Sequence, residues 1–280
     1  MEGVKIVRTE KSKISKSQKS EKADGPIRVV ILCGGRGTRF REQTEFIPKP
    51  MALIGNNPIL WHIMKIYDHY GFKEFVLPLG YKGDMIKDFF VHYIPITKDI
   101  TVYLKTGELK IHEDHQEDWT VHMVDTGQDS TTSKRLAQVK HLLKDSPYFM
   151  LTYGDGVADI PIDKLLEFHK KSGALVTISG FRPHHRFGIV EHHSGKVTAF
   201  KEKPRMQDLV NCGFMVFSNE ALSYFTGQEI MLEELLPKIA ADGKVAIYVH
   251  EGFWISMDTQ RDFEELNEIW KTNPCWKVWD

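Results

Sequence analysis

The sequence predicts an α/β fold in which a mostly parallel sheet is flanked by helices. Strand-like and helix-like segments alternate along the chain at lengths typical of such folds. The first strand-like segment is a β-branched apolar run over residues 27–33 that ends in glycines, which indicates a buried central strand. A length of 280 residues, of which 41% are apolar, allows one large domain or two small ones, with a buried core in either case.

The next elements follow the same alternation. A helix is predicted to open at Pro58, with its apolar residues on one side, and to close at Gly71. The following strand is expected at 75–79, where Pro78 indicates a strand end or a sheet edge. A helix over about 84–92 comes next.

The second half of the chain repeats this order. A strand is predicted at 148–153, and a helix at 162–171 with Phe168 among its inward-facing residues. A further strand is predicted at 174–181. Two other regions, 94–125 and 187–217, instead contain short alternating stretches, so small antiparallel additions are expected in both.

The chain divides into a tail, residues 1–25, and a single domain, residues 26–280. The tail has seven basic and four acidic residues and little apolar content, so it is expected to be disordered. A solvated tail or a remnant of cloning is preferred to a polyanion-binding arm.

Composition excludes several classes of function. A net charge of −1 gives no broad electrostatic basis for binding nucleic acid or a membrane. No apolar run approaches the roughly 20 residues that span a bilayer, and residues 1–20 lack the hydrophobic core that an export signal requires, so none is expected. The three scattered cysteines, Cys33, Cys212 and Cys275, form neither a disulfide framework nor a metal motif, so a cytoplasmic location is expected.

A glycine-rich loop follows the first strand as Gly34-Gly35-Arg36-Gly37-Thr38-Arg39. Glycines at a strand end let backbone N–H groups approach an anion, at the sheet edge where α/β proteins bind ligands. A dinucleotide fingerprint would need glycine at Phe40, and the P-loop spacing is absent. A phosphate loop with Lys49 downstream is therefore predicted, and a tight turn with incidental charges is the alternative.

Together with later motifs, this loop resembles the sugar-1-phosphate nucleotidyltransferase family, most closely its glucose-1-phosphate cytidylyltransferase branch. The resemblance extends over residues 27–279 and implies a Rossmann-like, GT-A-like nucleotidyltransferase fold. The motifs that carry it are Gly-Gly-x-Gly-Thr-Arg from Gly34, Pro-Lys-Pro-Met from Pro48, Gly-Tyr-Lys-Gly from Gly80, Val-Asp-Thr-Gly from Val124, Tyr-Gly-Asp-Gly from Tyr153, Glu-Lys-Pro from Glu202 and Met-Asp-Thr from Met257.

The resemblance implies transfer of a cytidylyl group from CTP to α-D-glucose 1-phosphate, giving CDP-glucose and pyrophosphate for deoxysugar and O-antigen synthesis. Both partners are small molecules, and a homo-oligomer is expected. Another sugar 1-phosphate or nucleotide is the near alternative, and a non-catalytic nucleotide-sugar-binding regulatory subunit is the distant one. The presence of Asp155, Asp258, Lys49 and Lys203 favours the enzyme.

Two aspartates are the expected ligands of a magnesium ion. Asp155 follows a strand between glycines, and hard carboxylate oxygens suit Mg²⁺, which takes one or two of them. The resemblance implies that Asp258 is its partner. For Asp159 and Asp262 a turn or capping role is preferred to metal binding.

The expected catalytic residues are cations, because the attacking phosphate is already anionic and needs no general base. Arg39 and Lys49 are expected to neutralise the triphosphate and the leaving pyrophosphate. The resemblance implies that Lys203 reaches the sugar phosphate. Arg135 and Arg186 are further phosphate candidates.

Base and sugar contacts complete the prediction. An acceptor such as Asp125 suits the N4 amino group of cytosine. The expected nucleotide-binding residues are Gly34, Gly35, Gly37, Thr38, Tyr81, Lys82, Asp125, Thr126, Gly127 and Arg135. The expected sugar-side residues are Gly154, Arg186, Glu202, Asn211 and Trp254, with Glu191 as a further candidate.

The chain departs from the family pattern at Ile47, where relatives carry lysine, at Cys33, where alanine is usual, and at Lys134, where glycine is common. The segment 182–185 is bulky, which would favour a hexose other than glucose if it lined the sugar pocket. The histidine clusters around His112 are interpreted as solvated loops rather than a zinc site.

Overall fold

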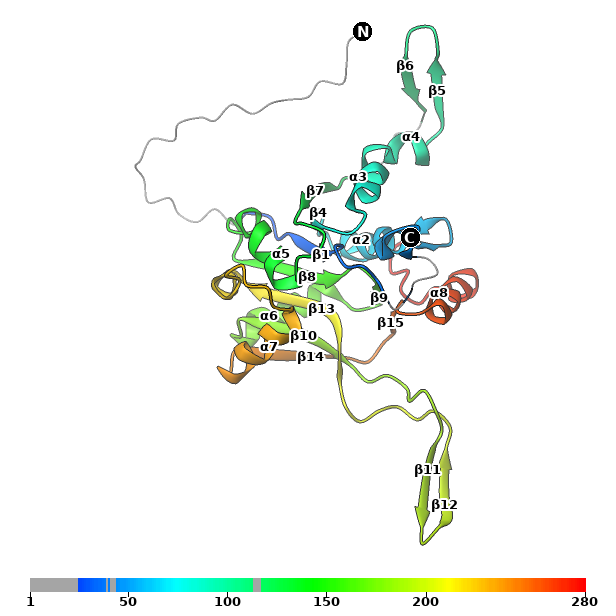
Figure 1. The fold of residues 1–280 in the computed structure, drawn as a ribbon, viewed down its shortest axis with the longest axis vertical. Coiled ribbons are helices and arrows are strands. Elements are labelled where there is room, and N and C mark those ends of the chain that lie inside the picture. The colour runs from blue at the N-terminus through cyan, green and yellow to red at the C-terminus, as the bar shows by residue number, and fades with distance from the viewer. Residues whose placement is uncertain (1–24, 39, 41–43, 113–116) are drawn as a thin grey trace, which may run out of the picture.

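A seven-stranded sheet forms the centre of the molecule in the computed structural model, which describes residues 25–38, 40, 44–112 and 117–280 (Figure 1). The strand order is β14-β10-β13-β8-β1-β4-β7. Every neighbouring pair is parallel except the two that involve β13, so the prediction of a mostly parallel sheet is confirmed. The strands are β1 (Val29–Leu32), β4 (Glu74–Leu79), β7 (Thr120–Asp125), β8 (Tyr148–Tyr153), β10 (Val176–Phe181), β13 (Val210–Ser218) and β14 (Val245–His250).

Helices cover both faces of this sheet (Figure 1). They are α2 (Ile59–His69), α3 (Gly83–Val91), α4 (Tyr93–Thr97), α5 (Thr132–Val139), α6 (Ile162–Ser172), α7 (Leu232–Ala241) and α8 (Gln260–Thr272), with 3-10 turns η1 (Lys49–Met51), η2 (Lys140–Leu142) and η3 (Asn219–Tyr224).

The alternation of β1 divides the core in two. Val29 and Ile31 belong to a cluster with α2, α6 and α8, whereas Val30 and Leu32 belong to a cluster with α5 and α7. All four are buried, as the apolar run predicts. Both faces of β1 are thus fixed, and the loop that follows it starts from a rigid strand end.

Small two-stranded sheets surround the central one. The predicted antiparallel additions are confirmed as the hairpins β5 (Ile100–Tyr103)–β6 (Glu108–Ile111) and β11 (Ile189–His193)–β12 (Lys196–Lys201). Both hairpins extend away from the body (Figure 1). The remaining pairs are β2 (Leu53–Ile54) with β3 (Asn57–Pro58) and β9 (Gly156–Ala158) with β15 (Trp254–Ser256).

Three predictions about elements are wrong. Residues 120–125 are a parallel strand of the central sheet, and 210–218 are its single antiparallel strand, rather than peripheral additions. Side chains of β7 alternate between the two faces of the sheet: Val121 and Met123 pack against one core cluster and Val124 against the other. Phe168, expected to face inward, is 36% exposed, and its ring packs edge-on against Tyr248 of β14.

Residues 1–24 of the expected tail lie outside the described residues, which begin at Gly25. Among the helices that the structure describes, none combines the length and apolarity needed to cross a bilayer.

The C-terminal segment packs on the body through its aromatic residues. Trp276 is fully buried, and its ring stacks on Phe253 and Trp270. Its Nε1 donates to Nδ1 of the buried His62 at 3.4 Å, and His62 Nε2 donates to the Ile54 carbonyl at 2.9 Å. His62 therefore holds the chain end in its neutral form.

We expect this contact to fail in acid. Burial lowers the pKa of His62 from 6.5 to about 4, so the unfolded chain is protonated first as the pH falls. Neutral His62 therefore contributes about 3 kcal/mol to the free energy of unfolding. This contribution is present above pH 6.5 and is lost as the pH falls from 6.5 to 4. Urea unfolding across this range should show a steeper loss for the wild type than for His62→Gln. Equal slopes would contradict the assignment.

Candidate active site

The candidate site lies at the carboxyl end of β1 and β8, where two aspartates come together. Asp155 follows β8 by two residues, and Asp258 follows β15 by two residues. The β9–β15 pairing places Gly156 opposite Ser256, and the amide of Met257 donates to the Asp155 carbonyl at 2.8 Å. Two segments about a hundred residues apart are thereby joined at one edge of the sheet.

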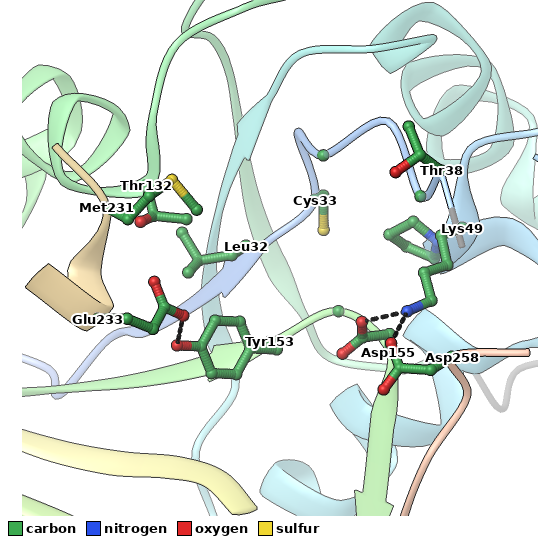
Figure 2. Close-up of a pocket in the computed structure, with 14 residues that line it drawn as sticks. Leu32, Cys33, Thr38, Lys49, Thr132, Tyr153, Asp155, Met231, Glu233 and Asp258 are labelled. Atoms are coloured by element: carbon green, nitrogen blue, oxygen red, sulfur yellow. Dashed lines mark hydrogen bonds and ion pairs between the residues drawn. The ribbon is translucent and has the colours of Figure 1, made fainter. Parts of the chain in front are cut away.

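Lys49 bridges the two aspartates (Figure 2). Its Nζ lies 2.6 Å from Asp155 Oδ2 and 2.9 Å from Asp258 Oδ1. Burial lowers the pKa of this ammonium group, but the two carboxylates outweigh burial and raise it above its ordinary value. Lys49 is therefore a permanent cation, only 9% exposed, at the centre of the site.

A cavity of about 330 Å³ opens between this triad and the glycine-rich loop. A second cavity of about 340 Å³ adjoins it and shares Asp155 and Asp258. The described residues of the first are Leu32, Cys33, Gly35, Gly37, Thr38, Lys49, Pro50, Thr132, Tyr153, Gly154, Asp155, Met231, Glu233 and Asp258. The structure thus brings the loop, the lysine and the two aspartates together around one cavity, whose volume is within the range of ligand sites.

Arg135 is buried beneath the glycine-rich loop and donates a hydrogen bond to it. It is 3% exposed, and its guanidinium donates to the carbonyls of Gly34 and Leu79 at 3.0 and 2.9 Å and to the Thr126 hydroxyl at 2.7 Å. It also reaches two carbonyls of the 126–128 turn. Arg135, predicted to contact phosphate, lines neither of the two cavities and instead ties the glycine loop to neighbouring strand ends.

Gly34 has no room for a side chain. A Cβ there would lie 2.3 Å from Arg135 Cζ, whereas a Cβ at Gly35 would meet nothing within 4 Å. Gly34→Ala is thus expected to break the Arg135 network and destabilise the protein by about 2–4 kcal/mol, or roughly 5–10 °C in Tm. Gly35→Ala, the matched control, should leave Tm almost unchanged in a thermal melt. Equal Tm values for both variants would contradict this packing.

The predicted base-side residues lie beside the loop. Thr126 is buried and donates to the Leu79 carbonyl at 2.6 Å. Asp125 Oδ1 accepts a hydrogen bond from the Gly127 amide at 2.9 Å. Tyr81 donates to the Thr44 carbonyl at 3.1 Å, and Lys82 donates to the Glu45 carbonyl. These hydrogen bonds hold the turn 125–127 and the 81–82 loop in place beside the glycine loop.

The predicted sugar-side residues separate into two groups. Asn211 and Trp254 line the second cavity, and Gly154 lines the first. Lys203, Glu202 and Arg186 are exposed on the links to the β11–β12 hairpin and line neither cavity. Glu191 is paired with Lys201 on that hairpin at 2.6 Å.

The expectation that Lys203, Glu202 and Arg186 share the pocket is therefore not met in this conformation. The β11–β12 hairpin and its links, residues 182–209, form an arm that extends away from the body and carries these three residues with it (Figure 1). A local sequence motif does not indicate the direction in which such an arm extends. Arg182, in the bulky 182–185 segment, pairs with Glu251 at 3.0 Å and does not line either cavity. This ion pair holds the start of the arm, just after β10, against the segment that follows β14.

The two other aspartates considered from the sequence, Asp159 and Asp262, have structural roles. Asp262 caps α8, accepting from the amides of Asp258 and Thr259 at 3.0 and 2.8 Å. Asp159 accepts from the Phe253 amide at 2.6 Å, and both are structural, as expected. Among the described residues no group of three or more histidine, cysteine or acidic side chains could hold a metal ion. Arg39 lies outside the described residues.

Sequence reasoning missed Tyr153 and Glu233 as site residues. The Tyr153 hydroxyl donates to Glu233 Oε1 at 2.5 Å, and both line the two cavities (Figure 2). Burial, followed by the Glu233 contact, raises the pKa of Tyr153 well above its ordinary value, so it remains a donor. Glu233 stands in the first turn of α7, where an acid is expected for local reasons, so no sequence signal marks it.

This chain resembles known proteins along most of its length. The family model described as "Nucleotidyl transferase" matches residues 28–273. A probable glucose-1-phosphate cytidylyltransferase of Bacillus subtilis is 41% identical over 90% of this chain and all of its own length. The glucose-1-phosphate cytidylyltransferase of Salmonella typhimurium is 39% identical over 91% of this chain and all of its own.

A more distant relative and a solved structure complete the comparison. The mannose-1-phosphate guanylyltransferase catalytic subunit beta of Xenopus tropicalis is 28% identical over 85% of this chain and 62% of its own length. The crystal structure of HddC from Yersinia pseudotuberculosis superposes with a TM-score of 0.63 at 22% identity, covering 86% of this chain and 98% of its own. That structure supports the fold.

Proposed function

Since the chain belongs to the nucleotidyl transferase family, we propose that it transfers the cytidylyl group of CTP to α-D-glucose 1-phosphate, giving CDP-glucose and pyrophosphate. The observation that carries this choice is the 39–41% identity to glucose-1-phosphate cytidylyltransferases over their whole length. Similarity to a guanylyltransferase is weaker and covers only part of that relative.

The reaction is attack by a sugar phosphate oxygen on the α-phosphorus of CTP, with pyrophosphate as the leaving group. Because the nucleophile is already anionic, the protein has to align two polyanions and neutralise their charge. Lys49 supplies a buried cation beside the loop. Arg39 would add a second charge at the triphosphate, and Lys203 a third at the sugar phosphate once the arm brings it inward.

Asp155 and Asp258 are suited to hold Mg²⁺. They are two carboxylates with side chains 27% and 35% exposed, which matches an ion that takes few protein ligands and completes its shell with phosphates and water. Such an ion would supply charge neutralisation at the phosphate oxygens. In the structure described here the Lys49 ammonium lies between these carboxylates.

Base selection is assigned to the turn 125–127 and the 81–82 loop. Asp125 retains an oxygen for the cytosine amino group after accepting from Gly127. Asn211 and Trp254 would contact the hexose. Exposed apolar side chains on the hairpins and their links, Leu104 at 93%, Phe187 at 79% and Phe200 at 63%, support a homo-oligomer. We place the enzyme in the cytoplasm, in nucleotide-sugar supply for O-antigen synthesis.

Incubation of the protein with CTP, α-D-glucose 1-phosphate and Mg²⁺ tests this function. Pyrophosphate release together with a product of the mass of CDP-glucose is expected. Binding of CTP without release of its pyrophosphate in the presence of any sugar 1-phosphate would instead identify a regulatory subunit.

A further inference from the structure

Glu233 lies on the wall that the two cavities share, and the proposed reaction gives it no role. It lines the cavity of the glycine loop and also the cavity that contains Asn211 and Trp254. Figure 2 shows its carboxylate directed at Tyr153, across the cavity from Lys49 and the two aspartates. Its Oε1 accepts the Tyr153 hydroxyl at 2.5 Å, which leaves Oε2 for another donor.

The chemistry of the second cavity indicates what that donor belongs to. Its described lining has three carboxylates, those of Asp155, Glu233 and Asp258, and no lysine or arginine. The rest of the described lining carries no carboxylate or amine and consists of Thr152, Tyr153, Gly156, Asn211, Cys212, Trp254 and Ser256. Lys49 pairs with Asp155 and Asp258 from outside this lining, so the lining itself offers no cation to an anionic group, whereas an uncharged polyol offers many O–H donors to such acceptors. The neutral hexose ring of the acceptor fits this description.

Glu233 is distinguished from the other two carboxylates by its contacts. Asp155 and Asp258 already bind Lys49 and stand where a metal would be held. Glu233 makes its described side-chain hydrogen bond to a neutral hydroxyl, that of Tyr153. Its charge is favoured by the N-terminus of α7, where it occupies the first turn. Its second carboxylate oxygen is therefore an acceptor available to a substrate hydroxyl.

The surroundings hold Glu233 and Tyr153 in place. The amide of Leu232 donates to the Thr132 hydroxyl at 2.6 Å, which ties the start of α7 to α5. The Tyr153 ring leans over Gly213, where a Cβ would lie 2.7 Å from its Cδ2. Gly213 has a φ of 85°, a left-handed conformation that also favours glycine. Backbone contacts on both sides thus fix the distance between ring and carboxylate.

We infer that Glu233 is a specificity-determining residue whose carboxylate accepts hydrogen bonds from hydroxyls of the hexose 1-phosphate, and that Tyr153 is the positioning residue that orients it. This inference rests on the proposed function, because it assigns a further residue to the same site.

Steady-state kinetics of Glu233→Ala test the assignment. Loss of hydrogen bonds to a charged acceptor should raise KM for α-D-glucose 1-phosphate about 10- to 100-fold, with KM for CTP changed less than about twofold. Tyr153→Phe keeps the ring and should give an intermediate increase. Glu234→Gln is the matched control, since it removes a charge from the adjacent residue, outside both cavities, and keeps an acceptor for the Met231 amide.

The decisive comparison is between the wild type and Glu233→Ala on a panel of glucose 1-phosphate analogues that each lack one hydroxyl group of the ring. The wild type should discriminate against at least one of them, and Glu233→Ala should lose that discrimination. Calorimetric titration of glucose 1-phosphate in the presence of α,β-methylene-CTP measures the same contact without turnover. If Glu233→Ala does not fold, the isosteric Glu233→Gln, which turns an amide N–H₂ toward the cavity, should still raise KM for the sugar about tenfold.

An unchanged KM for the sugar in a turning-over Glu233 variant would overturn the inference and leave the proposed function intact. A rise confined to KM for CTP would also overturn it, because Glu233 would then contact the nucleotide. Absence of turnover in the wild type with every substrate pair would instead defeat the proposed function.

Discussion

Replacing Asp155 with asparagine is expected to reduce pyrophosphate release by about 10³-fold. Asparagine has the same shape, and Lys49 keeps its 2.9 Å contact with Asp258, so the fold should persist. The loss would come from one carboxylate of the proposed metal site. Rates should be measured at saturating CTP and glucose 1-phosphate over a range of Mg²⁺ concentrations.

Asp163→Asn is the matched control for this substitution. Asp163 is an exposed acid in the first turn of α6, eight residues along the chain, and its replacement should leave the rate unchanged. A turnover of Asp155→Asn within tenfold of the wild type would remove Asp155 from the reacting centre. Calorimetric titration with Mg²⁺ and CTP gives a second readout, in which weaker metal binding is expected.

Replacing Lys49 with methionine is expected to have an effect of similar size, for a different reason. Removal of a preorganised buried cation from a phosphate-transfer site costs on the order of 10²- to 10³-fold in turnover. In the free protein the variant also leaves Asp155 and Asp258 without the ammonium between them. The variant should therefore bind Mg²⁺ more tightly than the wild type in the absence of nucleotide, although it turns over slowly.

The two substitutions thus move metal affinity in opposite directions. Lys164→Met, which removes a lysine whose side chain is 62% exposed on α6, is the control for loss of charge and should change neither turnover nor affinity. Weaker Mg²⁺ binding in Lys49→Met would contradict the competition between ammonium and metal.

Much of the fold follows from the sequence because its signals are local. The run at 27–33 contains β1, buried on both faces, and the helix expected after Pro58 is α2. Strand membership is not local. The stretch at 120–125 alternates like a peripheral hairpin, yet it pairs with β4 over six residues. Pairing over long sequence separations depends on neighbours that a local pattern does not identify.

The candidate site shows the same division. Lys49, Asp155 and Asp258 follow strand ends or lie next to the glycine loop, so topology alone brings them together. Lys203 belongs to an equally specific motif, but an extended hairpin decides its position, and it is exposed. Glu233 was missed for the opposite reason. It belongs to no motif, and it reaches the cavity from the first turn of α7, whose start is tied to α5 through the Thr132 hydroxyl.

Ile47, Cys33 and Lys134, which depart from the family pattern, have structural explanations. Ile47 packs partly buried against the core beside Pro48, so an apolar side chain is suited there. Cys33 is 1% exposed, and burial raises the pKa of its thiol well above the ordinary value, which makes it unreactive. Lys134 pairs with Glu229 on the surface. None of the three disturbs the Lys49 triad.

The most direct test of the proposed activity is a panel of initial rates of pyrophosphate release. CTP, UTP, dTTP, GTP and ATP would each be combined with α-D-glucose 1-phosphate, α-D-mannose 1-phosphate and α-D-galactose 1-phosphate in the presence of Mg²⁺. Turnover with CTP and glucose 1-phosphate should exceed every other pair by at least about 100-fold in kcat/KM, as expected when buried hydrogen bonds select a substrate. Equal rates with UTP or dTTP, or a faster reaction with another sugar phosphate, would contradict the account.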